Sequence, residues 1–215
     1  MNVSTLRNLH RLSAIFIATF LCVHITNHLS GLAGVEAHIA FMGIARSVYR
    51  IYLIEFALLS AIGFQIASGI TLVIRGWKQR RGFVSWLQAF SGLYLALFLL
   101  IHVGAIIYGR AILGLDTNFR YAAAGFHVPP WQWFFAPYYF LAVASLFTHV
   151  GCAVYWKLAS SWPIARRNAL LILTIRSKLA AGCLPARHFG PSCAAATSKK
   201  VLPGRRFEIL KSLRR

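Results

Sequence analysis

Histidines are the residues in this sequence most suited to chemistry, because four of them lie inside long apolar segments. His24 and His28 lie in the first segment, His102 in the third and His149 in the fourth, while the second carries Gln65. Polar or ionisable groups are costly inside a membrane, and where they occur they usually mark a functional site. Two imidazoles at one depth on different helices can hold a haem iron between them.

Four stretches without a charged residue must position these histidines. Hydrophobic residues make up 58% of the 215 residues and charged residues only 13%. The uncharged stretches follow Arg11, Glu55, Arg81 and Arg120 and hold 24, 19, 28 and 36 residues. About 20 helical residues cross a bilayer core. The sequence therefore predicts an all-α, polytopic transmembrane helical bundle with four spans plus an aborted or short fifth. The expected spans are His10–Leu32, Ile51–Ile74, Trp86–Tyr108 and Trp133–Leu158.

The net charge of +19 is distributed as in a membrane protein and argues against nucleic-acid binding. Thirteen of the 23 Lys and Arg residues lie from Lys157 onward, and the other ten lie in short segments beside the apolar stretches. Positive residues favour the cytoplasmic side of a membrane. We therefore expect a multi-pass protein of a bacterial-type inner (cytoplasmic) membrane, with both termini cytoplasmic if there are four spans. The first apolar stretch is too long for a signal-peptide core, so we interpret it as a span.

Two organisational units follow from this pattern. Residues 1–160 form the four-helix bundle, and residues 161–215 form a basic, low-order tail. The segment ARRNALLILTI begins like a fifth span but becomes charged after about eight apolar residues. Either the reading frame shifts near Ile175 and a natural fifth helix is lost, or the tail is a real extension that contacts anionic membrane lipid.

The connections between spans have features of their own. The segment GVEAHIAFMGIARSVYR, between the first and second spans, could lie as a short helix at the membrane interface. The stretch from Gly114 to Trp131, between the third and fourth, is expected to form a structured cap.

Depth pairs the polar side chains of the spans. Counting residues along alternating helices places His24 and His102 together in the outer half of the membrane, and Gln65 with His149 in the inner half. A haem between two imidazoles is one interpretation. Hydrogen bonding between helices and a proton or ion path are the others. His28 lies one turn beyond His24 and is interpreted as a neighbour of the ligand, although a copper or zinc site at this pair is conceivable.

The residues around these histidines carry a family resemblance. The segments FLCVHITNHLSGLAGVEAHIAFM, LIEFALLSAIGFQIASGITLVIRG and WLQAFSGLYLALFLLIHVGA resemble the cytochrome b membrane anchor of succinate dehydrogenases and fumarate reductases. The resemblance is to the single-chain, five-helix, two-haem type. It covers about residues 6 to 158 and is weaker in the fourth span, at FFAPYYFLAVASLFTHVGCAVYW.

The resemblance implies a function in electron transfer. Such anchors pass electrons between membrane quinone and a peripheral pair of flavoprotein and iron–sulfur subunits, through haem b. By resemblance, His24 and His102 are the metal ligands of one haem b in the outer half. The second haem would use His149 and the position of Gln65, and because an amide is a poor ligand for ferrous haem, that haem is expected to be absent or held by His149 alone. The cofactor-binding set is therefore His24, His102, His149, Gln65 and His28.

Several expectations accompany this interpretation. The chain carries no catalytic machinery of its own, so any enzyme activity would belong to a succinate:quinone-type oxidoreductase complex. The resemblance implies a proton carrier at the quinone site, with Glu36 or Glu55 as candidates, although we prefer to pair Glu55 with Arg50. Haem propionates could meet arginines at the outer face. The main alternative is a haem-free membrane scaffold or assembly protein of the same fold, and a third is a small transporter using His149 and Gln65. The arginines at the outer face that could meet haem propionates are Arg46, Arg50, Arg110 and Arg120.

Overall fold

The computed structural model describes residues 1–182, and this part of the chain contains helices, turns and loops but no strand. Four of its helices are long and apolar enough to cross a membrane, and three shorter ones connect or extend them. The predicted all-α membrane bundle is therefore confirmed. The long helices are α1 (Val3–Ser30, continued to Ala33 by the 3-10 turn η1), α3 (Tyr52–Gly76), α4 (Phe83–Ala111) and α6 (Gln132–Lys157). The shorter ones are α2 (Val35–Tyr49), α5 (Phe119–His127) and α7 (Ile164–Gly182).

The start of α1 is where the predicted spans differ most from the structure. The prediction placed the first residue at His10, but α1 begins two turns earlier at Val3. The side chain of Asn2 caps this start by accepting a hydrogen bond from the Ser4 backbone N–H. His10 consequently lies within the helix, where it can contact α3.

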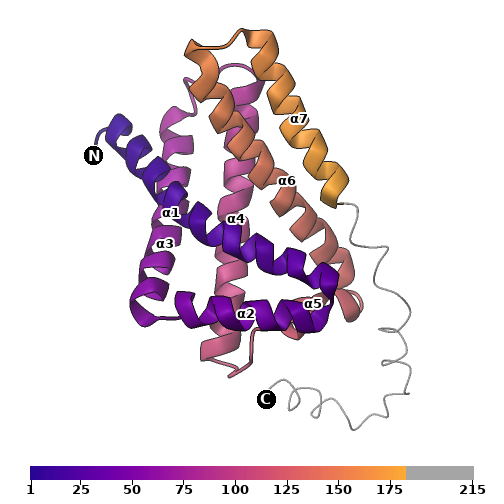
Figure 1. Ribbon diagram of the computed structural model, residues 1–215. Coiled ribbons are helices and arrows are strands. Elements are labelled where there is room, and N and C mark those ends of the chain that lie inside the picture. The colour runs from indigo at the N-terminus through magenta and orange to yellow at the C-terminus, as the bar shows by residue number, and fades with distance from the viewer. Residues whose placement is uncertain (183–215) are drawn as a thin grey trace.

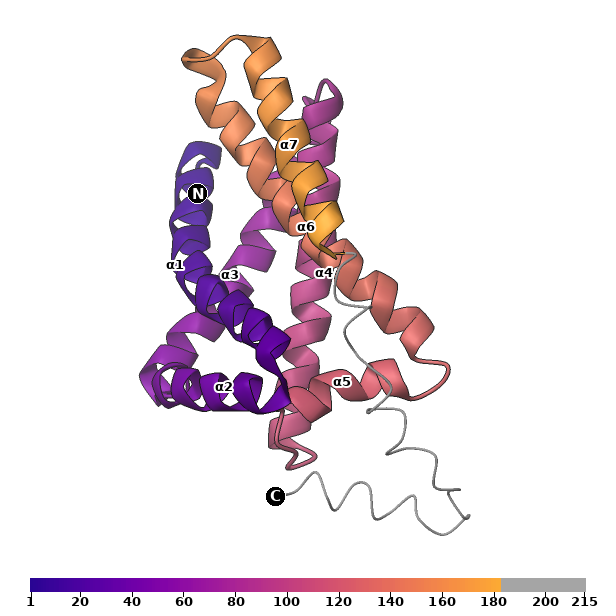
Figure 2. The ribbon, with the colours of Figure 1, turned by 45° about the vertical axis from the view of Figure 1, so that its right-hand side comes forward.

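The long helices associate in two pairs (Figures 1 and 2). α1 packs along α3, and α4 packs along α6, while the contact between α3 and α4 joins the two pairs. Backbone contact between α1 and α4 is marginal at most. Contact between α1 and α4 is therefore made mainly by side chains, because the two backbones hardly approach each other.

One end of the bundle, here called the capped end, is covered by α2 and α5 (Figures 1 and 2). α2 lies across the ends of the long helices, and it forms the short helix predicted for this segment. It begins after Gly34, whose φ of 117° favours glycine. α5 begins at the cap formed by Asn118 and packs on α4 through Tyr121, whose hydroxyl donates to the Ala105 carbonyl. Each connection at this end is thus a built element rather than a loose loop.

Ion pairs fasten the capped end, and one of them corrects a prediction. Glu55 was expected to pair with Arg50, but its carboxylate accepts from the Arg110 guanidinium of α4. Arg50 instead donates to the Thr117 hydroxyl in the loop before α5. Because α2 lies across the bundle, Arg50 extends towards this loop. A second pair joins Arg46 to Asp116, with an N–O distance of 2.8 Å.

α7 forms a fifth helix alongside α6 (Figure 2). Cys152 and Tyr155 of α6 and Leu171 of α7 form a buried cluster between them, and the Arg167 guanidinium lies over the Tyr155 ring at 4.6 Å. α7 therefore fits the predicted short fifth helix, but it lies within residues 161–215, the segment predicted to be low-order. The remainder of the predicted tail, residues 183–215, lies outside the described residues, and with it the frameshift question.

Candidate functional site

The two histidines predicted to face each other lie close together. His24 projects from α1 and His102 from α4, and the centroids of their rings are 6.3 Å apart with an interplanar angle of 71°. Both side chains are half-buried. Phe20 stacks on the ring of His24, and Phe98 stacks on the ring of His102, so each imidazole has an apolar ring against one face. We call these two phenylalanines the frame of the pair. Depth counting therefore identified two side chains that the fold brings together.

The separation of these rings fits one metal ion between them. A metal–imidazole bond is about 2.0–2.1 Å long, so two imidazoles on opposite sides of one iron have ring centroids about 6 Å apart. The two rings come from helices whose backbones are not in close contact, which is what a flat macrocycle between them requires. In the present side-chain arrangement Nε2 of His24 faces Nε2 of His28 at 3.2 Å, so ligation through this nitrogen would require the His24 ring to turn away from His28. The donor set otherwise fits a haem iron.

Two further imidazoles extend this group towards the capped end, and we call His24, His28, His38 and His102 the imidazole row. The His24 and His28 rings are 4.7 Å apart, and the His28 and His38 rings 5.6 Å. His38, on α2, is buried and accepts a hydrogen bond at Nε2 from the Asn27 side-chain amide, 3.2 Å away. Burial, with a smaller effect of Arg46, lowers the pKa of His38, so this ring is neutral near pH 7.

The copper or zinc alternative finds less support in this arrangement. A structural zinc site takes four protein ligands and a catalytic one three. Among residues 1–182 no group of three or more His, Cys, Asp or Glu side chains is arranged to hold a metal ion. The pair His24 and His28 therefore lacks a third protein ligand in this part of the chain, whereas two imidazoles would be enough to hold a haem.

The polar residues nearer the opposite end form hydrogen bonds within each helix pair. The Gln65 amide nitrogen lies 3.0 Å from Nε2 of His10, and its oxygen accepts from the Ser13 hydroxyl. Because the amide donates to Nε2, Nδ1 of His10 carries the proton, and it lies 2.7 Å from the Ser68 hydroxyl. Gly69 allows this approach, since a Cβ there would lie 3.3 Å from the His10 ring. We call His10, Ser13, Gln65 and Ser68 the α1–α3 network.

His149 is held on the other helix pair. Its Nδ1 lies 3.0 Å from the Gln88 carbonyl oxygen and 3.4 Å from the Ser91 hydroxyl, both on α4. Gly92 makes room for the ring, because a Cβ there would lie 2.8 Å from Cε1 of His149. Gln65 and His149, expected at one depth, thus each take hydrogen-bond partners from their own helix pair.

His10 and His38 are the residues of these clusters that sequence reasoning undervalued. His10 was set aside as the start of a helix, and His38 was assigned only to an interfacial segment. A signal for His10 was present: His10 with Ser13 and Gln65 with Ser68 are both polar pairs three residues apart, a spacing that places each pair on one helix face. The burial of His38 depends on the docking of α2, which no local pattern fixes.

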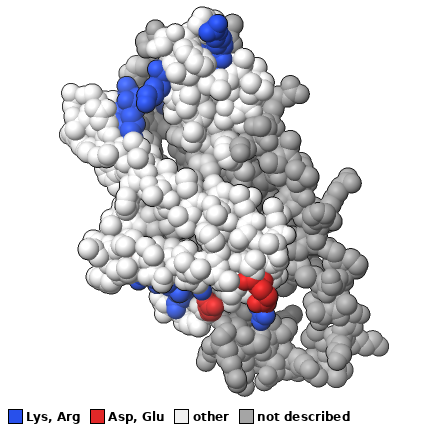
Figure 3. Space-filling model, in the orientation of Figure 1, with Lys and Arg blue, Asp and Glu red and all other residues white. Residues whose placement is uncertain are grey.

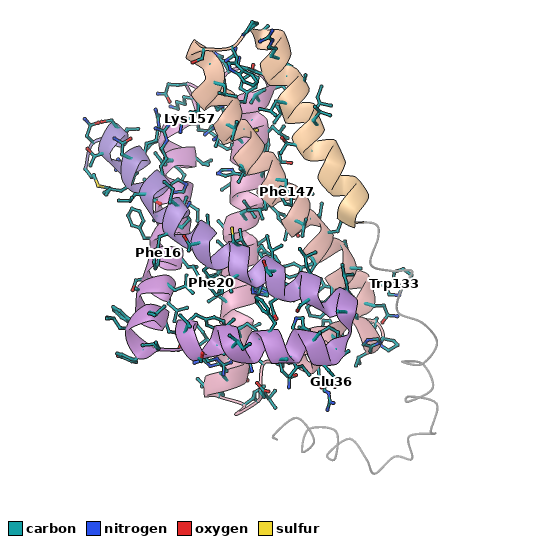
Figure 4. The ribbon with its side chains drawn as sticks, viewed as in Figure 1. Phe16, Phe20, Glu36, Trp133, Phe147 and Lys157 are labelled. Atoms are coloured by element: carbon teal, nitrogen blue, oxygen red, sulfur yellow. The ribbon has the colours of Figure 1, made fainter. Side chains whose placement is uncertain are left out.

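A groove on the outside of the bundle contains the carboxylate predicted as a proton carrier. It has a volume of about 360 Å³, lies between α3 and α4 near the capped end, and holds the Glu55–Arg110 ion pair. Glu36, the other candidate, is exposed at the start of α2 and points away from the bundle (Figure 4). Besides Glu55 and Arg110, the groove between α3 and α4 is lined by Tyr52, Phe56, Leu59, Ile107 and Ala111.

Comparisons of the chain with known proteins found no match. No protein-family model matches the chain, and neither a curated protein nor a solved structure is significantly similar to it. The four apolar helices define a multi-pass membrane protein of all-α fold.

Proposed function

We propose that this protein is the membrane-anchor subunit of a succinate dehydrogenase or fumarate reductase-like complex, holding one haem b between His24 and His102. Haem b, when bound, would supply a one-electron carrier within the membrane. The chain would pass electrons between a peripheral dehydrogenase and membrane quinone and would have no catalytic residues of its own. The family resemblance of the first three spans supports this function.

One observation carries the proposal: two imidazoles, 6.3 Å apart between ring centroids, project from two helices whose backbones share at most a marginal contact. Imidazoles that only joined helices would be expected to hydrogen-bond a partner on the neighbouring helix, as His149 does with the Gln88 carbonyl. His24 contacts His28 of its own helix instead. The frame of Phe20 and Phe98 would keep the ligand pair away from water, which is one of the protein's means of tuning a haem potential.

The charge distribution supports an orientation and a docking side. Among the described residues, every charged side chain at the end opposite α2 is basic (Figure 3), so we propose that this end faces the cytoplasm of a bacterial-type cell. Flavoprotein and iron–sulfur subunits would dock at that end. The His24–His102 pair would then lie in the half of the membrane remote from them, as the sequence predicted.

Quinone would exchange electrons near the capped end. The groove with the Glu55–Arg110 pair opens on the outside of the bundle, where a lipid-soluble molecule can enter. Arg110 follows His102 by eight residues on α4, about 12 Å along the helix axis. Glu55 would accept or supply a proton at a quinone oxygen, and Arg110 would hold that carboxylate in place.

Absorption spectroscopy of the purified protein tests this proposal. We expect a low-spin ferrous b-type spectrum, lost in His24→Ala and in His102→Ala because each removes one of the two imidazoles that would hold the haem. His28→Ala and His149→Ala are the matched controls, since each removes an imidazole of a span that the proposal does not use as a ligand. Both controls should retain the spectrum.

Two outcomes would count against the proposal. A folded, colourless preparation from haem-sufficient cells would favour the alternative of a haem-free membrane scaffold or assembly protein. The observation that supports this alternative is the α1–α3 network, whose polar side chains hydrogen-bond one another. Loss of the spectrum in His149→Ala alone would show that haem is bound elsewhere in the bundle. Co-purification of flavoprotein and iron–sulfur polypeptides tests the partner assignment separately from the haem.

A further inference from the structure

Charge is divided unequally between the two ends of the molecule (Figure 3). The capped end holds four arginines and three carboxylates, a net charge of +1. The opposite end, here called the basic end, includes Lys157 (Figure 4) and has no carboxylate among the described residues. The described cations of the basic end are Arg7, Arg11, Arg75, Lys78, Arg80, Arg81, Lys157, Arg166 and Arg167.

The partners of these cations differ between the ends. At the capped end, Arg46 and Arg110 pair with carboxylates. At the basic end, the arginines of the α3–α4 turn donate to neutral backbone oxygens: Arg80 to the Ser85 carbonyl, and Arg81 to the carbonyls of Lys78 and Arg80. A carbonyl orients a guanidinium but does not neutralise it. The charge of this turn therefore remains available to an external anion.

An exposed aromatic surface adjoins this turn. Trp77 packs against the edge of Trp86, and Trp86 stacks on Phe90 one turn further along α4. The Arg80 guanidinium lies over the Trp86 ring at 5.8 Å, which draws that cation towards the bundle. Trp77 is 44% exposed and Phe90 57% exposed. A basic turn and a column of apolar rings thus form one continuous surface at the membrane boundary.

We propose that this surface binds an anionic phospholipid. Lys78 and Arg81, both exposed, would contact the headgroup phosphate. Arg81 uses only Nη1 for its two carbonyl contacts, and a guanidinium has five N–H donors, so donors remain for a phosphate. An acyl chain would lie along Trp77 and Phe90. This inference does not depend on haem binding.

The depth of Phe90 favours a lipid over an acidic protein from the aqueous phase. Phe90 lies eight residues after Gly82, which precedes α4, and therefore about 12 Å further into the membrane. A protein docking from water would meet Lys78 and Arg81 but would not reach this ring. A phospholipid spans both depths.

Native mass spectrometry of the delipidated full chain tests the site, with phosphatidylglycerol and phosphatidylcholine as probes. We expect phosphatidylglycerol to bind at least tenfold more tightly and to lose affinity as salt is raised. A basic residue near an anionic lipid strengthens binding about fivefold, so Lys78→Gln with Arg81→Gln should weaken phosphatidylglycerol binding about 25-fold. Both side chains are exposed, and circular dichroism checks that the double variant remains folded.

The matched control is Arg7→Gln with Arg11→Gln, which removes the same charge from the same end but from α1. It should leave binding within about twofold. An equal loss in both double variants would mean that overall charge, not a site, attracts the lipid, and would overturn the proposal. Equal binding of the two lipids would overturn it as well. So would unchanged lipid binding in the Lys78 and Arg81 variant accompanied by loss of an acidic protein partner.

Discussion

Replacing Gln65 by leucine tests whether this residue is structural or part of a cofactor site. Gln65→Leu keeps the size of the side chain and removes both of its hydrogen bonds, to Nε2 of His10 and from the Ser13 hydroxyl. Ser13 can still donate to the His10 backbone carbonyl, so the main unpaired group is the His10 ring. We expect destabilisation of the contact between α1 and α3 without a change in any haem spectrum.

The magnitude follows from hydrogen bonds measured inside membranes rather than in water. Such interhelical bonds contribute about 0.6 kcal/mol on average and about 1.7 kcal/mol at most, because the unfolded chain in the membrane also finds partners. Two bonds therefore give an expected loss of about 1–2 kcal/mol. The matched control is Thr71→Ala, also on α3, because its hydroxyl donates only to the Ala67 carbonyl of its own helix. It should cost less than half as much.

Unfolding of the purified protein by denaturing detergent, followed by circular dichroism, measures this difference. A double-mutant cycle with His10→Leu should give a coupling energy of about 0.6–1.7 kcal/mol, since the two residues share one bond. Additive effects of the two substitutions would refute the α1–α3 network. Loss of a haem spectrum in Gln65→Leu at unchanged stability would refute the structural role and indicate that Gln65 lies against the cofactor.

Two other predictions concern single positions. Gly92→Ala should destabilise the protein by about 1–3 kcal/mol, measured in the same unfolding assay, because its Cβ would meet the His149 ring; Gly104→Ala, with no atom within 4 Å of the new Cβ, should be close to neutral. His38 has a lowered pKa in the folded state, so the unfolded chain binds its proton more readily and stability should fall as pH drops below about 6.5. Thermal midpoints between pH 8 and 5 measure this slope, which should be shallower in His38→Leu; an unchanged slope would assign it to other groups.

The spans and the principal pair of histidines could be predicted from the sequence because both depend on local properties. Uncharged stretches of span length define where helices cross the membrane. Residue counting at a fixed rise along helices of alternating direction then places His24 and His102 at one depth. Their ring separation of 6.3 Å agrees with that expectation.

The features that escaped prediction depend on how elements dock. The pairing of Glu55 with Arg110 follows from the contact between α3 and α4, and sequence proximity suggested Arg50 instead. His38 is buried only because α2 lies across the bundle and against Phe119 of α5. The start of α1 was predicted seven residues too late, at His10 rather than Val3, because a helix can continue beyond the apolar stretch and through the interface with its basic side chains in the headgroups.

The two polar layers of the bundle differ in the number of available partners, and this difference argues for a single cofactor. In the α1–α3 network every ring nitrogen of His10 has a partner, and Nδ1 of His149 is held by a backbone carbonyl. In the imidazole row, the Nε2 atoms of His24 and His28 face each other. Nδ1 of His38 is buried and has no hydrogen-bond partner. Buried polar groups are normally hydrogen-bonded. In the α1–α3 network both polar atoms of the Gln65 amide and both ring nitrogens of His10 have protein partners, which leaves neither side chain free to bind an iron. This supports the proposal of a haem at His24 and His102 and none at Gln65.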